Sequence, residues 1–231
     1  MLELFPEGFE EREGEGWLEL AAYSESGERA VRATFSRVAI TAVAEDWADR
    51  WRDFHRAVRL GPLWVGPPWL EAPIGAIPVV IDPGRAFGTG AHPTTQLCLE
   101  LLLEVEPGSL LDVGCGSGVL AIAAAKLGFG PVTALDHEEA ATETASRNAD
   151  ANGLRIAVVT GDALADEPLP EAEVTVANIA LEAIRSLASN VRSPRFVASG
   201  YLARDDPRPP GFRREKRLER EGWAADSYAR E

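Results

Sequence analysis

The second half of the chain alternates between short apolar runs and longer segments whose apolar residues recur at helical spacing. The apolar runs, each four or five residues long, predict strands at residues 110–113, 132–136, 155–159, 174–178 and 196–199. The segments between them predict helices at residues 93–105, 118–127, 138–152 and 181–189. This alternation predicts an α/β fold in which a doubly wound, mostly parallel sheet carries helices on both faces.

The first 78 residues follow a different pattern. Residues 16–23, 33–38 and 40–43 carry β-forming residues, whereas Trp47, Trp51, Phe54 and Val58 recur at the spacing of a helix or turn. Residues 61–78 are rich in proline and glycine. We therefore expect a small α+β N-terminal domain over residues 1–60, an irregular linker over 61–78, and the main domain over 79–231. The last residues are charged, with a final strand expected at 223–228.

Composition and charge narrow the choice of partner. The chain has 231 residues, of which 45% are hydrophobic, and a net charge of −14. That charge disfavours a nucleic-acid partner. It suits a basic protein substrate, although solubility explains it equally well. The start has no signal-peptide pattern and no apolar run spans a bilayer, so we expect a cytoplasmic protein without a membrane partner. The two cysteines, Cys98 and Cys115, lie in no metal-ligand spacing, and Cys98 is expected in the core.

A glycine-rich turn follows the first strand of the main domain. Gly114, Gly116 and Gly118 come directly after the apolar run and open an alanine-rich helix. Glycines here allow positive φ and let a ligand approach the backbone, and a doubly wound sheet binds its ligand at this edge. In the dinucleotide-binding fingerprint the third glycine follows the second by three positions, whereas Gly118 follows Gly116 by two. This spacing argues against a nicotinamide cofactor.

The turn with the preceding acid, Asp112, resembles the first motif of the class I methyltransferases, which bind S-adenosylmethionine. That resemblance implies a Rossmann-like methyltransferase domain in which Asp112 orients the turn and helps to hold the ammonium group of the cofactor. Asp136 ends the next strand, where a carboxylate can accept both ribose hydroxyls; the alternative is a solvated acid at a strand end. Asp162 follows the third strand, where the loop of this fold usually contacts the adenine amino group.

Asn178 ends the fourth strand and is the candidate catalytic residue. Its amide oxygen can accept a hydrogen bond from an amine and so orient the lone pair of that amine. The alternative is a helix N-cap before Leu181. Residues 82–95 (DPGRAFGTGAHPTT) read as a mobile glycine-containing loop, after which Thr94 or Thr95 caps the next helix. His92 in this loop reads as a base or, equally, as a structural residue.

The segment 82–95 is very similar to the Phe-Gly-Thr-Gly-x-His-x-Thr-Thr signature of the PrmA family, bacterial methyltransferases of large-subunit ribosomal protein eleven. Residues 112–128 (DVGCGSGVLAIAAAKLG) and 176–179 (VANI) match the same family. By position, the resemblance puts cofactor contacts at Thr95, Gly114, Asp136 and Asn178. It implies methylation of the α-amine and lysine amines of a ribosomal protein, and a ferredoxin-like N-terminal recognition domain.

Two regions depart from the family pattern. The N-terminal part lacks a match for the first strand and helix of the ferredoxin-like unit, and residues 204–214 are rich in proline and arginine where the family has a helix. We expect the remnant to pack on the main domain or on a second copy of the chain. The predicted reaction is methyl transfer to a neutral amine oriented by Asn178, with no general base identified. The alternatives are a methyltransferase with another acceptor and a non-catalytic cofactor-binding protein.

Overall fold

The computed structural model describes residues 10–14, 17–21, 31–32, 35, 38, 56–82, 90–165 and 168–231. It divides into two compact units, residues 1–50 and residues 51–231. None of the described helices is long and apolar enough to cross a membrane.

The first unit contains an antiparallel pair of strands, β1 (Glu10–Gly14) and β2 (Trp17–Ala21). The strand predicted at residues 16–23 is therefore confirmed. The β-forming runs at 33–38 and 40–43 and the aromatic segment before residue 56 lie almost wholly outside the described residues. The truncated ferredoxin-like domain accordingly stays a prediction.

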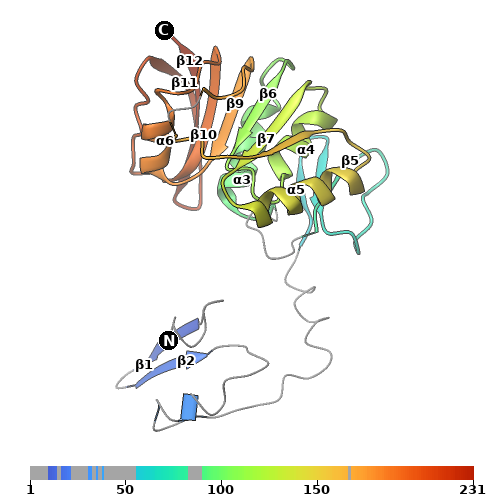
Figure 1. The fold of residues 1–231 in the computed structure, drawn as a ribbon. Helices are drawn as coiled ribbons and strands as arrows, with labels where there is room; N and C mark the ends of the chain where they lie inside the picture. The colour runs from blue at the N-terminus through green and yellow to red at the C-terminus, as the bar shows by residue number, and fades with distance from the viewer. Residues whose placement is uncertain are drawn as a thin grey trace. The chain divides into compact units, whose positions relative to one another are not determined.

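The second unit is built on a seven-stranded sheet (Figure 1) with the order β11-β12-β10-β9-β6-β7-β8. Five strands are parallel: β6 (Leu110–Val113), β7 (Val132–Asp136), β8 (Ala157–Thr160), β9 (Val174–Asn178) and β10 (Arg195–Leu202). The chain runs from β6 outward through β7 to β8 and then returns to β9 on the other side of β6. Strand order therefore reverses between β6 and β9, and such a switch point is where doubly wound sheets bind ligands.

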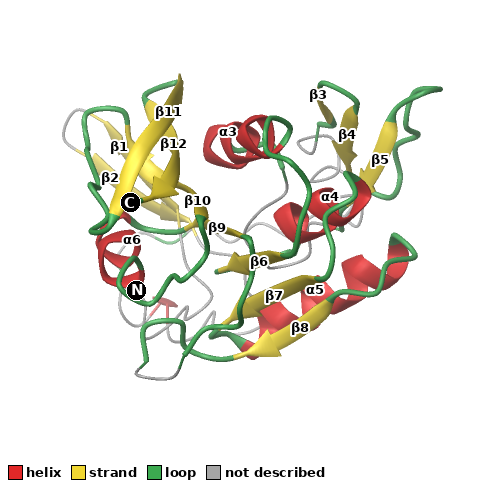
Figure 2. Ribbon diagram, turned by 90° about the horizontal axis from the view of Figure 1, so that it is seen from above, coloured by secondary structure: helices red, strands yellow, loops and turns green. Residues whose placement is uncertain are grey.

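Helices cover both faces of this sheet, as the sequence predicts. Figure 2 shows α3 (Pro93–Leu102), α4 (Val119–Lys126) and α5 (Glu139–Ala151) on one face and α6 (Leu181–Leu187) on the other. Each face has its own hydrophobic cluster. The larger includes Cys98 and Ile122 beneath the three helices, and the smaller includes Ile184 and Phe196 beneath α6.

The prediction of an irregular linker over residues 61–78 is wrong. Residues 58–80 form a second, three-stranded sheet from β3 (Val58–Leu60), β4 (Leu63–Gly66) and β5 (Ile77–Val80). Leu63, Val65 and Val79 are fully buried and belong to the larger hydrophobic cluster. The three strands are only three or four residues long, and the proline-rich stretch between β4 and β5 obscured their short apolar runs in the sequence.

The sequence pattern did not predict β11 (Phe212–Arg220), whereas β12 (Trp223–Arg230) confirms the expected final strand. Only Phe212 is fully buried in β11, since this edge strand presents mostly charged side chains and has no apolar alternation. Both β10 and β11 are antiparallel to β12, so β10 and β11 run in the same direction and begin at the same end of the sheet. Residues 203–211 connect the end of β10 to the start of β11 at the opposite end of the sheet, and they contain no helix. The sequence departs from the family pattern at this place.

Candidate functional site

The residues singled out in the sequence meet at the carboxyl edge of the parallel strands. In the sheet register Val113 lies opposite both Leu135 and Ala177. The residues that follow each of these three positions therefore share one level of the edge. They are Gly114, Asp136 and Asn178, which places the glycine turn between the predicted ribose acid and the predicted catalytic amide.

The glycine turn needs a backbone conformation that favours glycine at three positions. The φ angles of Gly114, Gly116 and Gly118 are +71°, +52° and +81°. The N–H groups of Gly114 and Cys115 both donate to the carbonyl oxygen of Leu135, at 2.8 and 3.1 Å. The turn is thus fastened to the end of β7, and Gly118 begins α4 as a left-handed N-cap without a side-chain hydrogen bond.

Two of these glycines are also required by packing within the chain. A β-carbon at Gly114 would collide with the Cγ2 methyl of Ile179, the residue after Asn178. A β-carbon at Gly118 would lie 3.0 Å from that of Ala145 in α5. The turn is therefore pressed against both the end of β9 and α5, and a side chain at either position would displace it.

Asp112 lies beneath the turn as a buried carboxyl group, only 1% exposed. Its Oδ2 accepts a hydrogen bond from the N–H of Ala121 at 3.0 Å, whereas Oδ1 has no hydrogen-bond partner among the described residues. Burial raises the pKa of Asp112 to about 7; the Ala121 N–H opposes this shift and the charge of Asp136 adds to it. An unsatisfied buried oxygen of this kind is suited to a cation or a donor brought by a ligand.

Asp136 bridges the turn and the start of the next helical segment. Its Oδ2 accepts from the N–H of Gly116 at 2.9 Å, and its Oδ1 accepts from the N–H of Glu138 at 3.1 Å. Each carboxylate oxygen can accept more than one hydrogen bond, so both can also receive hydroxyl donors. The side chain is held by two backbone groups, and the alternative of a freely solvated acid does not fit its 7% exposure.

Asn178 is oriented by a residue 83 positions earlier in the chain. Its Nδ2 donates to Oγ1 of Thr95 at 3.2 Å, and Thr95 is fully buried in the first turn of α3. The alternative role of Asn178 as a helix cap is wrong, because the N-cap of α6 is Ala180 and no side chain caps it. The donor end of the amide is thus fixed by Thr95, which assigns the acceptor role at the site to its carbonyl oxygen.

His92, rather than Thr94 or Thr95, caps α3. The ring Nδ1 of His92 accepts from the N–H of Thr94 at 3.3 Å and lies 2.7 Å from its Oγ1. The ring packs edge-on against Trp223, with 5.0 Å between the ring centroids. This is a structural role, which the sequence left open beside that of a base. Residues 83–89, predicted to belong to a mobile loop, lie outside the described residues.

The structure defines the surroundings of the other predicted residues by fewer contacts. Asp162 follows β8 at the same edge and is exposed, and its Oδ1 accepts from the N–H of Leu164 at 2.8 Å. His137, which follows Asp136, is largely exposed. Cys98 is fully buried, as expected. The sequence reasoning missed two residues that contact the glycine turn or the residue after Asn178, namely Asn148 and Gly200. The available signal for Asn148 was a second asparagine, Asn152, four positions later on the same predicted helix.

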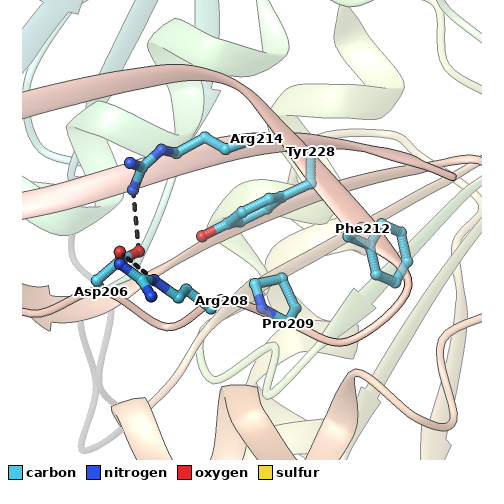
Figure 3. Close-up of a pocket in the computed structure, with 6 residues that line it drawn as sticks. All are labelled: Asp206, Arg208, Pro209, Phe212, Arg214 and Tyr228. Carbon is cyan, nitrogen blue, oxygen red and sulfur yellow. Dashed lines mark hydrogen bonds and ion pairs between the residues drawn. The ribbon is translucent and has the colours of Figure 1, made fainter.

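A separate cavity of about 370 Å³ lies away from these residues, between β11, β12 and the crossing segment (Figure 3). Asp206 in its wall pairs with Arg208 at 2.7 Å and with Arg214 at 3.1 Å, and the pKa of Asp206 is lowered chiefly by the hydrogen bond from Arg208. Tyr228 in the wall donates to the buried carboxylate of Asp226. The charged groups of the cavity wall are therefore paired within the chain, and none of the predicted site residues lines it.

Comparison with known proteins agrees with this geometry. A sequence model of the family described as "Ribosomal protein L11 methyltransferase (PrmA)" matches residues 11–228. A ribosomal protein L11 methyltransferase of Myxococcus xanthus is 36% identical over 81% of this chain and 69% of its own length. One of Symbiobacterium thermophilum is 46% identical over 69% of this chain and 55% of its own length.

A solved structure gives the same result. The crystal structure of a ribosomal protein L11 methylase from Lactobacillus delbrueckii subsp. bulgaricus superposes with a TM-score of 0.66 at 32% identity, and covers 76% of this chain and 98% of that chain. The family match extends over both units and all the predicted site positions. The chain belongs to the ribosomal protein L11 methyltransferase (PrmA) family.

Proposed function

We propose that this protein is an S-adenosylmethionine-dependent methyltransferase that transfers methyl groups to amines of a ribosomal protein. The observation that carries the proposal is the arrangement of Gly116, Asp136 and Asn178 at the strand-order switch. The carboxylate is bonded to the turn at 2.9 Å, and the oriented amide lies at the same level of the sheet edge. Family membership names the reaction class that this arrangement serves.

The residues present fit the cofactor. The glycine turn offers backbone without side chains, Asp136 offers two acceptor oxygens for the ribose hydroxyls, and Asp112 offers a buried oxygen without a partner among the described residues. Gly114, Gly118, Thr95, Asn178 and Asp162 complete the proposed set around them. When bound, S-adenosylmethionine supplies an electrophilic methyl group.

The chain itself provides alignment and exclusion of water. Asn178, with its Nδ2 bonded to Thr95, presents its carbonyl oxygen to accept an N–H of the acceptor amine and so directs the nitrogen lone pair. Binding that removes water from the acceptor disfavours its ammonium form, which favours the neutral amine that can react. In this proposal the contribution of the protein is positioning, and Asn178 is its catalytic residue.

A ribosomal protein as the substrate follows from the family and from charge. The relatives are named for ribosomal protein L11, and a chain with a net charge of −14 attracts a basic protein. The chain spans 55–69% of the length of the two curated relatives described above. Substrate recognition is accordingly the part of the proposal that needs its own test.

The decisive experiment incubates the protein with radiolabelled S-adenosylmethionine and purified L11-type ribosomal protein, followed by gel autoradiography. We expect label in the ribosomal protein with the wild type and little with Asn178→Ala. Label in another acceptor from a ribosome-free extract, and none in the ribosomal protein, would favour a different methyl acceptor. Failure to bind S-adenosylmethionine in calorimetry would contradict the proposal as a whole.

Three further features stay predictions: pairing of two copies through the N-terminal residues, the absence of a nucleic-acid partner, and a cytoplasmic location. Light scattering after size-exclusion chromatography tests the first directly. A mass of two chains that falls to one after removal of residues 1–50 would support it. A monomer at micromolar concentration would contradict it.

A further inference from the structure

Two asparagines of α5 pair with the outer edge of β5 as a neighbouring strand would. Asn152 accepts from the N–H of Val80 at 3.0 Å and donates to its carbonyl oxygen at 2.6 Å. Asn148 accepts from the N–H of Asp82 at 3.0 Å and donates to its carbonyl oxygen at 3.4 Å. The opposite edge of β5 is occupied by β4, for example through Ile81 N–H and the carbonyl oxygen of Gly66 at 2.9 Å.

The spacing of the two asparagines explains how a helix can serve as a strand. Four residues of a helix advance by about 6 Å. Two residues of a strand advance by roughly 6.6 Å. Asn148 and Asn152 are four apart, and Val80 and Asp82 are two apart, so both amides meet alternate backbone positions of the same edge. α5 therefore fixes the position of the chain at the point where it leaves β5.

The two asparagines differ in their remaining N–H group. Nδ2 of Asn152 donates to the carbonyl oxygen of Asn148 in its own helix, at 2.8 Å. Nδ2 of Asn148 instead donates to the carbonyl oxygen of Ser117 at 2.9 Å. Ser117 is fully buried and precedes Gly118 in the glycine turn, and Asn148 is only 2% exposed. Asn148 alone of the pair connects α5 to the turn through its side chain.

We propose that Asn148 is a positioning residue for S-adenosylmethionine, which it influences by holding the glycine turn in its binding conformation. The proposal rests on the function proposed above. Three residues of the turn are glycines with positive φ, and because glycine has no β-carbon, other backbone conformations are also open to the turn. A hydrogen bond to the Ser117 carbonyl, at the last peptide unit before Gly118, selects one of them. The same side chain anchors Asp82, so turn and β5 exit are held by one buried amide.

The test compares Asn148→Ala with Asn152→Ala as a matched control, since both remove an amide from the β5 edge and only the first releases Ser117. We expect both variants to lower the melting temperature. Asn148→Ala should weaken S-adenosylhomocysteine binding at least 10-fold in calorimetry, and Asn152→Ala less than twofold. In turnover assays Asn148→Ala should raise KM for S-adenosylmethionine and leave KM for the acceptor unchanged.

Equal weakening by both variants, or normal binding by a folded Asn148→Ala, would overturn the proposal. Asn148→Asp is the second variant if the alanine variant fails to fold, because it keeps the acceptor for Asp82 N–H and loses the donor to Ser117. It should weaken binding as Asn148→Ala does, and normal binding by it would equally refute the role. A wild-type protein that does not bind S-adenosylhomocysteine would instead contradict the proposed function.

Discussion

Gly200 lies so close to the backbone of Ile179 that a β-carbon at Gly200 would collide with the Ile179 carbonyl oxygen and lie 2.6 Å from its carbonyl carbon. The φ angle of Gly200 is +103°, and the pairing of β10 with β12 shifts register at this position. On its other side Ile179 packs against Gly114. Ile179 is thus packed against glycines that come from both neighbours of β9, and this arrangement fixes the backbone next to Asn178, the proposed catalytic residue.

We predict that Gly200→Ala destabilises the protein more than Gly222→Ala does. Both glycines have positive φ, so each alanine costs about 1–2 kcal/mol in backbone strain. Gly222 has open space around it, whereas Gly200→Ala also overpacks Ile179, which adds roughly 1–3 kcal/mol. Urea denaturation of the two variants measures the difference. Equal losses in the free energy of unfolding would show that the close approach to Ile179 is not restrictive.

Replacement of Asn178 should affect turnover more than cofactor binding. Asn178→Ala removes the acceptor that we propose orients the amine, and misplacement of a reacting group can cost on the order of 100-fold in kcat. Thr95→Val keeps the shape but removes the hydroxyl that receives Nδ2 of Asn178, so we expect an intermediate loss. Steady-state kinetics on the ribosomal substrate would decide. A fall in S-adenosylmethionine affinity as large as the fall in kcat would contradict the assigned role.

Loss of the Asp136 carboxylate should weaken the cofactor complex. A hydrogen bond to a charged group contributes about 1.5–3 kcal/mol, so Asp136→Ala should bind S-adenosylhomocysteine roughly 10-fold to 150-fold less tightly. The same change frees the N–H of Gly116 and loosens the turn. Calorimetry measures the affinity, with the exposed Glu139→Ala as control. Undiminished affinity in a folded Asp136→Ala protein would remove Asp136 from the site.

Asp112 should make stability depend on pH. In the folded protein its pKa is raised from 3.8 to about 7, chiefly by burial. Between these values the unfolded chain releases the proton that the folded chain keeps. The free energy of unfolding therefore falls as pH rises from about 4 to about 7, by at most about 1.4 kcal/mol per pH unit, and this contribution is level above pH 7.

The variant Asp112→Asn cannot titrate and isolates this effect. Urea denaturation of both proteins at pH 5 and pH 8 should show the wild type losing stability relative to Asp112→Asn as the pH rises. Other ionisable groups are common to both proteins, so their contributions cancel in the comparison. A stability difference that is the same at the two pH values would mean that Asp112 is ionised throughout this range.

The sequence by itself determined the α/β fold and the order of the main elements. Short apolar runs are typical of parallel strands covered by helices on both faces, and a helical period marks each helix with one buried face, which is why all five parallel strands and all four described helices of the second unit were predicted. The glycine turn and the strand-end positions of Asp136 and Asn178 also followed from the sequence, because parallel strands bring their carboxyl ends to one edge.

Only the tertiary structure decided how these residues are held. The hydrogen bond of Asn178 to Thr95, the packing of Ile179 against Gly114 and Gly200, and the hydrogen bond of Asn148 to Ser117 join segments 21 to 83 positions apart along the chain. β11 was missed because an edge strand with charged side chains has no apolar period, and β4 because prolines follow it closely. The pattern of apolar residues along one helix or strand shows which of its residues are buried, whereas contacts between distant segments depend on how the elements pack.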